Sequence, residues 1–322
     1  MNPIVMNQKP NPSLDLKSGL MLLLLSAVWG ASFFFVELAL PEVPPLTITL
    51  HRVIWALPIL GVVLLVRNLS LPRSLKVWGA YMVMGALNNA IPFSLIFWGQ
   101  TKIDAGLASI LNATTAMTTA VIAGLLLKDE PLTARKLLGA ILGFAGVVYI
   151  MGPQAVTSFD PANLAQLAVL AATFSYALAG VWGRTALSDL PSLVNASGML
   201  VGSAVLMLPI VLIVDGVPSL HLSHESWGAL LGLAILSTSL AYVLYFAILA
   251  RAGAANLLLA TLLVPVFAIM LGAAFLGERV IEEAWIGFGI IVVGFIVTDG
   301  RLLGANRTPN NKSAPERERR DV

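Results

Sequence analysis

Two hydrophobic stretches 148 residues apart, "GFAGVVYIMG" (143–152) and "GIIVVGFIVTDG" (289–300), each end on two glycines that are six residues apart. Shifting the chain on itself by the same 148 residues aligns Gly124 with Gly272, Gly139 with Gly287, Gly146 with Gly294, Gly152 with Gly300, and Glu130 with Glu278. The two 55-residue segments compared, 98–152 and 246–300, contain seven glycines each. Chance predicts about one coincidence of glycines between them, and four occur. The chain therefore contains an internal repeat.

The composition indicates that this repeat lies in a membrane. Of the 322 residues, 58% are hydrophobic and 11% are charged, whereas about a quarter of the residues in a soluble domain are charged. The chain contains no cysteine, which excludes a disulfide framework and a thiolate metal site. The sequence also lacks HExxH, GxSxG and P-loop motifs. It therefore predicts no enzyme, no catalytic residue, no cofactor and no metal site.

Ten mainly apolar stretches are long enough to cross the hydrocarbon core, which takes about 20 residues of α-helix. They lie near 19–39, 46–66, 76–98, 104–127, 136–152, 163–184, 190–214, 226–249, 253–276 and 283–300. The loops between them are short, so we expect no inserted soluble domain. The predicted fold class is an all-α integral membrane protein with ten transmembrane helices.

The ten helices divide into two copies of five. We expect a cytoplasmic N-terminal segment at 1–17, a first repeat at 18–152, a second repeat at 163–300, and a disordered basic cytoplasmic tail at 301–322. Because five is an odd number, the second repeat must enter the membrane upside down relative to the first. Inverted repeats of this kind are characteristic of secondary transporters, which bind their substrates near the bilayer midplane.

The distribution of Lys and Arg predicts the orientation of the helices. If the N-terminus is cytoplasmic, sixteen of the 19 basic residues lie on the cytoplasmic side, Lys102 and Arg279 lie on the opposite side, and Arg52 lies within a span. Cytoplasmic loops of membrane proteins carry such an excess of positive charge. We therefore expect both termini to be cytoplasmic.

Several motifs resemble a known family of transporters. They are "AVWGASFFF" (27–35), the pair His51 and Arg52, "DAGLASIL" (104–111), "KDEPLTARKLLGAILGFAGVV" (128–148) and "LVPVFAIMLGAAFLGERVIEEAWIGFGIIVVGF" (263–295). Together they look like the ten-helix drug/metabolite transporters with two EamA-type domains. The resemblance covers residues 18–300. It implies export or exchange of small metabolites, often amino acids, across the bacterial inner membrane.

Polar and aromatic side chains within the spans are candidates to bind a substrate. They are Trp29, Phe33, Arg52, Asn88, Asn112, Thr115, Thr119, Ser175, Thr238, Tyr242 and Asn256. Asn112, Thr115 and Thr119 follow helical spacing, and such a polar stripe should not face lipid. Asn88 adjoins a second asparagine, and only one of two neighbours on an α-helix points inward. Ordinary helix packing and interhelical hydrogen bonding are the competing explanation for all of these residues.

Two charged residues within the spans require a separate explanation. Glu37 lies near the outer end of the first span, and Arg52 lies about 10 Å from the outer end of the second, at ~1.5 Å per residue. They can form an ion pair that fixes two adjacent helices. Alternatively, Arg52 holds a carboxylate of the substrate, or Glu37 is a titratable group that couples transport to protons. His51 adjoins Arg52 but points elsewhere on the helix, so we do not include it in the site.

The sequence thus predicts a multi-pass secondary transporter of the bacterial inner membrane that moves small organic metabolites, such as amino acids, outward by alternating access. Its expected partners are a small-molecule substrate and the lipid bilayer, with no nucleic acid; a monomer and a homodimer both stay open. Proton-coupled multidrug efflux is one alternative. It is weakened because the acid of the first span, Glu37, lies near the outer end rather than at mid-depth. A non-transporting receptor or scaffold is the alternative from another class, since function resides in sites rather than folds.

Overall fold

A computed structural model describes residues 15–128, 131–151, 161–257 and 259–299, and every regular element in these ranges is helical. The elements are α1 (Leu16–Ala39), α2 (Pro45–Val66), α3 (Leu75–Gly85), η1 (Ala86–Ala90), α4 (Ile91–Gln100), α5 (Ala105–Asn112), α6 (Thr115–Leu126), α7 (Ala134–Met151), α8 (Pro161–Ala186), α9 (Ser192–Val214), α10 (His224–Ala234), η3 (Ile235–Leu240), α11 (Ala241–Leu257), α12 (Leu259–Leu271), η4 (Gly272–Leu276) and α13 (Glu282–Asp299). The expected N-terminal segment before residue 15, the tail at 301–322 and Glu130 lie outside the described residues.

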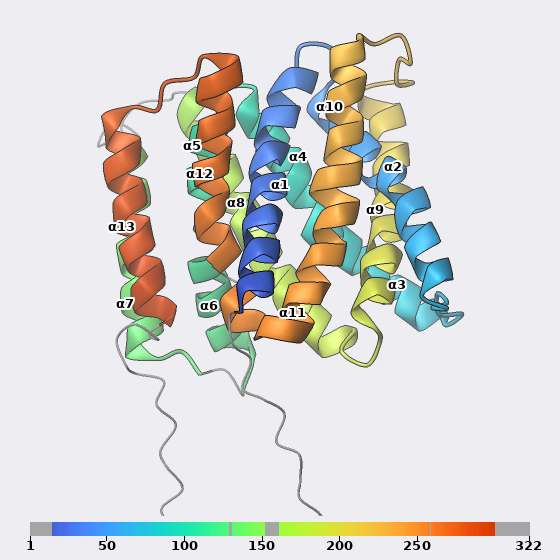
Figure 1. The fold of residues 1–322 in the computed structure, drawn as a ribbon, viewed down its shortest axis with the longest axis horizontal. Coiled ribbons are helices and arrows are strands. Elements are labelled where there is room, and N and C mark those ends of the chain that lie inside the picture. Colours follow the sequence, from blue (N-terminus) through green and yellow to red (C-terminus); the bar gives the residue numbers. More distant parts are fainter. Residues whose placement is uncertain (1–14, 129–130, 152–160, 258, 300–322) are drawn as a thin grey trace, which may run out of the picture.

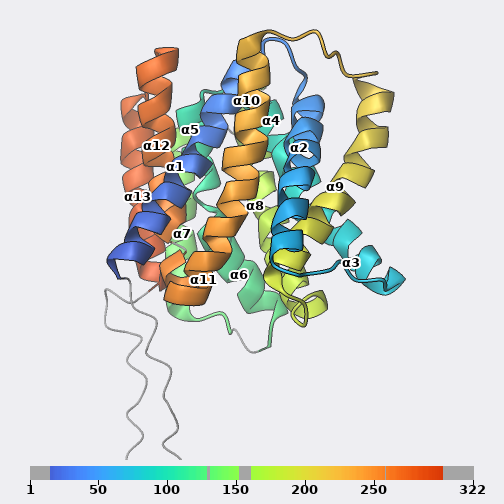
Figure 2. The same ribbon diagram turned by 45° about the vertical axis from the view of Figure 1, so that its right-hand side comes forward.

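Eight helical segments in the described ranges are long and apolar enough to cross a membrane. They coincide with eight of the ten predicted spans, and α7 and α13 occupy the positions of the predicted fifth and tenth spans. The helices alternate in direction along the chain and form one bundle (Figures 1 and 2). In Figure 1, α1 begins and α13 ends at the lower end of this bundle. The protein is therefore a multi-pass, all-helical membrane protein.

Four of the repeated glycines lie where α7 and α13 pack against each other at one edge of the bundle (Figure 1): Gly139, Gly146, Gly287 and Gly294. A Cβ atom on Gly146 would lie 2.7 Å from the carbonyl oxygen of Gly287, and a Cβ atom on Gly139 would lie 2.6 Å from that of Gly294. The pairing is reciprocal, because Gly287 and Gly294 are the repeat partners of Gly139 and Gly146. Small residues let helix backbones approach closely in a membrane. The same spacing recurs because each copy supplies half of one antiparallel contact.

Two helices of the bundle contain a π-helical turn at corresponding places. The turn η1 joins α3 to α4, and η3 joins α10 to α11. Pro92 follows η1 and has no backbone N–H, so a regular α-helical hydrogen bond is impossible at that point. In η3, the hydroxyls of Thr238 and Ser239 donate to carbonyl oxygens five residues earlier, at 2.9 Å each. Such π turns are frequent at functional sites.

At the upper end of the bundle in Figure 1, carboxylates from one half of the chain accept hydrogen bonds from the other half. Glu278, after η4, accepts the backbone N–H groups of Ala105 and Gly106 at 3.0 and 3.2 Å, where α5 begins. Glu42 accepts the N–H of Ser223 at 2.9 Å. A carboxylate at the start of a helix satisfies free N–H groups and interacts favourably with the helix dipole. These contacts hold the two halves together at this end.

Candidate functional site

Arg52 is a cation buried in the bundle, with 6% of its surface exposed. Its Nε donates to the hydroxyl of Thr238 at 3.0 Å, and its Nη2 donates to the carbonyl oxygen of Ser237 at 3.2 Å. The guanidinium carbon lies 3.9 Å from the ring centroid of Phe93 and 5.8 Å from that of Phe97. Among the described residues, no carboxylate forms an ion pair with it. The partners of this buried charge in the described part of the chain are therefore neutral.

The turn η3 positions the partners of Arg52. The hydroxyl of Thr238 donates to the carbonyl of Leu233 at 2.9 Å, so its oxygen is oriented to accept from Arg52. The hydroxyl of Ser237 donates to the carbonyl of Val28 on α1 at 2.6 Å. Both side chains are buried. One π turn of the second half of the chain therefore binds α1 and α2 of the first half together around the guanidinium group.

A second polar group surrounds the hydroxyl of Tyr242 on α11. This hydroxyl donates to Oδ1 of Asn89 at 3.3 Å and lies 3.5 Å from Nδ2 of Asn88. Nδ2 of Asn89 donates to the hydroxyl of Ser203 on α9 at 2.9 Å. Tyr242 also lies close enough to Arg52 for an electrostatic interaction. Tyr242, which follows two residues after η3, thus connects α11 to both asparagines of η1.

The two asparagines of η1 correct one sequence-based expectation. We expected a single inward-pointing side chain at this place, Asn88, but both asparagines contact Tyr242. Asn89 is fully buried and makes the shorter hydrogen bond. The expectation assumed regular α-helical spacing, whereas a π turn widens the helix and changes the angle between neighbouring side chains. Asn89 therefore belongs to the candidate site together with Asn88.

The aromatic candidates on α1 lie beside this group. Trp29 is half-buried and packs against Tyr245 of α11, with 6.0 Å between the ring centroids. Phe33 is buried, and its carbonyl oxygen accepts a hydrogen bond from Nε2 of Gln100 at 2.9 Å. Tyr242 stacks on Phe246 at 6.3 Å. Aromatic surface and hydroxyl groups together suit an amphipathic solute.

Glu37 does not pair with Arg52. Its Oε1 accepts a hydrogen bond from Nε2 of Gln100 at 3.0 Å, while Arg52 is bound to η3. The ion pair that the sequence left open is therefore absent from this conformation. Gln100 is buried at the end of α4, and its Oε1 has no hydrogen-bond partner. The charged residues of the first two spans thus occupy separate environments.

The remaining candidates support the helices around the site. The hydroxyl of Thr115 donates to the carbonyl of Asn112 at 2.6 Å, the side-chain oxygen of Asn112 is buried without a partner, and Thr119 is half-buried. Within the described part of the chain, no hydrogen bond links these three to the Arg52 group. Ser175 donates to a backbone carbonyl of η1 at 2.7 Å and so stabilises that turn. The side chain of Asn256 lies outside the described residues.

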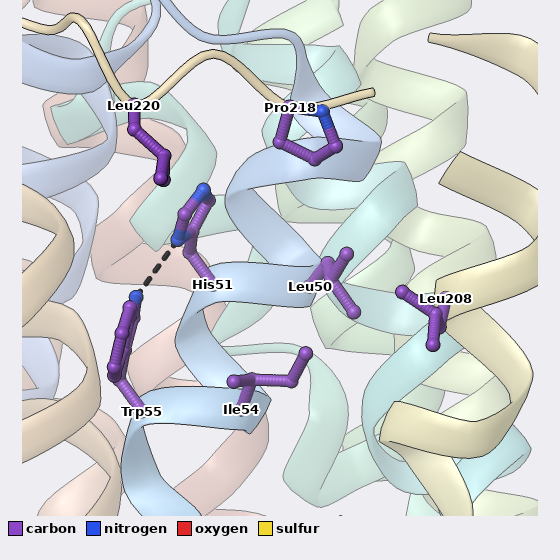
Figure 3. A pocket seen from close by; sticks show the side chains of 7 residues that line it. All are labelled: Leu50, His51, Ile54, Trp55, Leu208, Pro218 and Leu220. Atoms are coloured by element: carbon purple, nitrogen blue, oxygen red, sulfur yellow. Dashed lines mark hydrogen bonds between the residues drawn. The ribbon is translucent and has the colours of Figure 1, made fainter. Parts of the chain in front are cut away.

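His51 lines a separate pocket of about 260 Å³ (Figure 3). The other lining residues are Leu50, Ile54, Trp55, Leu208, Pro218 and Leu220. Nε1 of Trp55 donates to Nδ1 of His51 at 2.8 Å, and Nε2 of the imidazole has no partner among the described residues. The pocket is otherwise apolar, and neither Arg52 nor its partners line it. His51 is therefore not part of the Arg52 group.

Several residues of this region escaped the sequence analysis. They are Phe93, Gln100, Ser203 and Ser237. The run of hydroxyl residues at 237–239 is a signal that was available in the sequence, because three consecutive polar residues inside an apolar span need partners. Phe93 gives no such signal, since an apolar ring in an apolar span is unremarkable in sequence. Its place beneath Arg52 follows from helix packing alone.

A multi-pass helical bundle in which a buried cation of the first half meets polar groups of the second half is typical of membrane transporters. The chain belongs to the EamA-like transporter family, whose model matches residues 17–152 and again residues 163–298. The two matches correspond to the two copies of the internal repeat.

The chain is similar to transporters over most of its length. "Uncharacterized transporter YoaV" of Bacillus subtilis (strain 168) is 25% identical over 84% of this chain and 92% of its own. "Protein PecM" of Dickeya dadantii (strain 3937) is 26% identical over 87% and 91%. "Uncharacterized inner membrane transporter YedA" of Escherichia coli (strain K12) is 24% identical over 86% and 89%. A solved structure titled "Crystal structure of protein" shares the fold, with 20% identity, a TM-score of 0.64 and coverage of 89% and 97%.

Proposed function

We propose that this transporter exports small organic metabolites that carry a carboxylate, such as amino acids and related compounds, by alternating access across the bacterial inner membrane. The proposal includes ten membrane-spanning helices with both termini in the cytoplasm. The similarity to an inner membrane transporter of E. coli supports the location. The orientation is supported by the basic residues, of which sixteen would lie on the cytoplasmic side and two on the opposite side.

The observation that carries the proposal is the buried guanidinium of Arg52, whose partners in the described residues are all neutral. Nε and Nη2 are engaged by η3, while Nη1 donates no hydrogen bond to the described residues. A guanidinium group presents five N–H donors in a fixed fork that matches a carboxylate. Charge-assisted hydrogen bonds of this kind are roughly twice as strong as neutral ones. A substrate carboxylate would supply the missing negative charge.

The surroundings of Arg52 suit the rest of such a molecule. Tyr242, Asn88 and Asn89 offer hydrogen-bond donors and acceptors, and Phe93 and Phe97 offer apolar surface. Arg52 is 6% exposed, so the helices must move before a solute can reach it from either side. That requirement agrees with alternating access.

The positive charge of Arg52 argues against the efflux of cationic drugs, because a buried like charge repels them. The scaffold alternative gives no reason for keeping an unpaired cation in the membrane, since apolar residues of similar size are generally as stable as buried charges. Arg52 therefore favours anion transport over both alternatives.

Counterflow in proteoliposomes tests the proposal. Vesicles preloaded with a mixture of carboxylates, including the twenty amino acids, are given single labelled compounds, and uptake is compared for wild type, Arg52→Gln and Arg67→Gln. Arg67 lies at the exposed end of the same helix, so its variant is a matched control. Accelerated uptake at low substrate concentration that Arg52→Gln strongly reduces and Arg67→Gln retains supports the proposal. Uptake of neutral or cationic compounds that is insensitive to Arg52→Gln would overturn it.

A further inference from the structure

The amide of Gln100 has an unsatisfied oxygen beside an acid. Nε2 uses its two hydrogens on the carbonyl oxygen of Phe33 at 2.9 Å and on Oε1 of Glu37 at 3.0 Å. Rotating the amide by a half-turn would place its oxygen against these two acceptors, so the orientation of the group is fixed by its partners. Oε1 of Gln100 is then a buried acceptor without a donor. Buried polar groups in native structures nearly always have partners.

A protonated Glu37 supplies the missing donor. A carboxylic acid and a primary amide form a cyclic pair with two hydrogen bonds: the amide N–H donates to one carboxyl oxygen, and the carboxyl O–H donates to the amide oxygen. The first of these two bonds is present between Nε2 of Gln100 and Oε1 of Glu37. An ionised Glu37 has no hydrogen to donate and leaves the amide oxygen of Gln100 unpaired.

The charges around Glu37 also favour the proton. The charged groups that act on it are Asp104, next to the start of α5, and Glu278, after η4, and both are acidic. Glu37 forms no ion pair with Lys102 or Arg279 in the described part of the chain. The other helices packed against α1 contribute no charged group that acts on Glu37. An ionised Glu37 therefore has one neutral hydrogen-bond donor, Gln100, and two negatively charged neighbours.

We propose that Glu37 is the proton-binding site of the transport cycle, holding a proton in this conformation, and that Gln100 is the positioning residue that detects it. This inference rests on the proposed function and names its coupling ion. When the proton passes from Glu37 to water, the hydrogen bond to the amide oxygen of Gln100 is lost, and Asp104 and Glu278 repel the carboxylate that is left. Since the proposed substrate flux is outward and bacterial proton gradients drive protons inward, the proton is exchanged for the substrate.

Infrared difference spectroscopy of the purified protein tests the proton without transport. Raising the pH should remove the C=O band of a protonated carboxylic acid in wild type. Glu37→Gln should lack the part of this change that is due to Glu37, because glutamine forms the same pair but has no proton to lose. Gln100→Leu should shift the band, since the acid loses its amide partner. Glu42→Gln, which replaces a glutamate after the end of α1 that is bonded to Ser223, should behave as wild type.

Proteoliposomes test the coupling. An imposed pH gradient should stimulate substrate flux in wild type and in Glu42→Gln but not in Glu37→Gln, which should keep counterflow without a gradient. Equal stimulation of Glu37→Gln and wild type, or a pH-dependent acid band of the same size in both proteins, would overturn the inference. If wild type shows no counterflow of any carboxylate, the proposed function fails, and the infrared arm still decides whether Glu37 binds the proton.

Discussion

Nε of Arg52, in the first EamA-like segment, donates a hydrogen bond to the hydroxyl of Thr238, in the second, at 3.0 Å. The bond crosses from α2 to the π turn η3 and orients the guanidinium group between the two halves of the chain. In a protein whose halves rock against each other, a substrate held by this group would be held by both halves. The proposed substrate site then lies at the contact between the two repeats.

Replacing Arg52 should weaken carboxylate binding without unfolding the protein. Removing a charge-assisted hydrogen bond costs about 1.5–3 kcal/mol, so Arg52→Gln should raise the half-saturation concentration in counterflow by roughly tenfold to a hundredfold. Arg52→Lys should recover part of this affinity, because it keeps the charge but loses the planar fork. Melting temperatures in detergent should stay close to that of wild type for both variants. An unchanged half-saturation concentration in Arg52→Gln would contradict the assignment.

The hydroxyl of Thr238 should matter through Arg52. Thr238→Val removes the oxygen that accepts from Nε, while the carbonyl of Ser237 still accepts from Nη2. We expect a smaller loss than in Arg52→Gln, about fivefold in half-saturation concentration, because this bond orients the guanidinium group and does not itself hold the substrate. Thr238→Ser keeps the hydroxyl and should restore wild-type values. In the background of Arg52→Gln, Thr238→Val should have little further effect, and a full additional loss would show independent roles.

The contact between α7 and α13 should tolerate no side chain at its glycines. Gly146→Ala places a Cβ atom 2.7 Å from the carbonyl oxygen of Gly287, so the helices must separate. Overpacking of this kind costs about 1–3 kcal/mol. Gly289→Ala is the matched control on α13, because its Cβ atom meets nothing within 4 Å. Gly146→Ala should lower the melting temperature in detergent, and Gly289→Ala should leave it unchanged or raise it.

Two glutamates in the loops should give opposite pH dependence. Burial raises the pKa of Glu278 above its ordinary value of 4.5, and the N–H of Ser223 holds the pKa of Glu42 below it. The stability due to Glu278 is therefore fully present below pH 4.5 and is lost as the pH rises through its folded-state pKa. The stability due to Glu42 is present above pH 4.5 and is lost as the pH falls through its lowered pKa.

Melting temperatures of Glu278→Gln and Glu42→Gln, measured against wild type across this pH range, check these signs. The advantage of wild type over Glu278→Gln should shrink as the pH rises, whereas its advantage over Glu42→Gln should shrink as the pH falls. If the melting-temperature difference from wild type changes with pH in the same direction for both variants, the environments of the two carboxyl groups differ from those described here.

The sequence alone determined the membrane-embedded helices and the internal repeat. Both depend on local properties: the hydropathy of about 20 consecutive residues and the spacing of residues along one chain. The glycines that reveal the repeat also form a contact that the structure confirms, because Gly146 and Gly287 lie against each other. The sequence also identified Arg52 as a candidate site residue for a local reason, because it is a charge within an apolar span.

Only the tertiary structure decided which groups meet. Arg52 pairs with Thr238 rather than with Glu37, and Glu37 pairs with Gln100, because the packing of distant helices sets these distances. The π turn η1 brought Asn89 into the site beside Asn88, which regular helical periodicity does not predict. Hydropathy and periodicity describe which face of a helix avoids lipid. They contain no information about the partner on the other side, and that partner determines whether a buried polar group holds a substrate, a proton or a neighbouring helix.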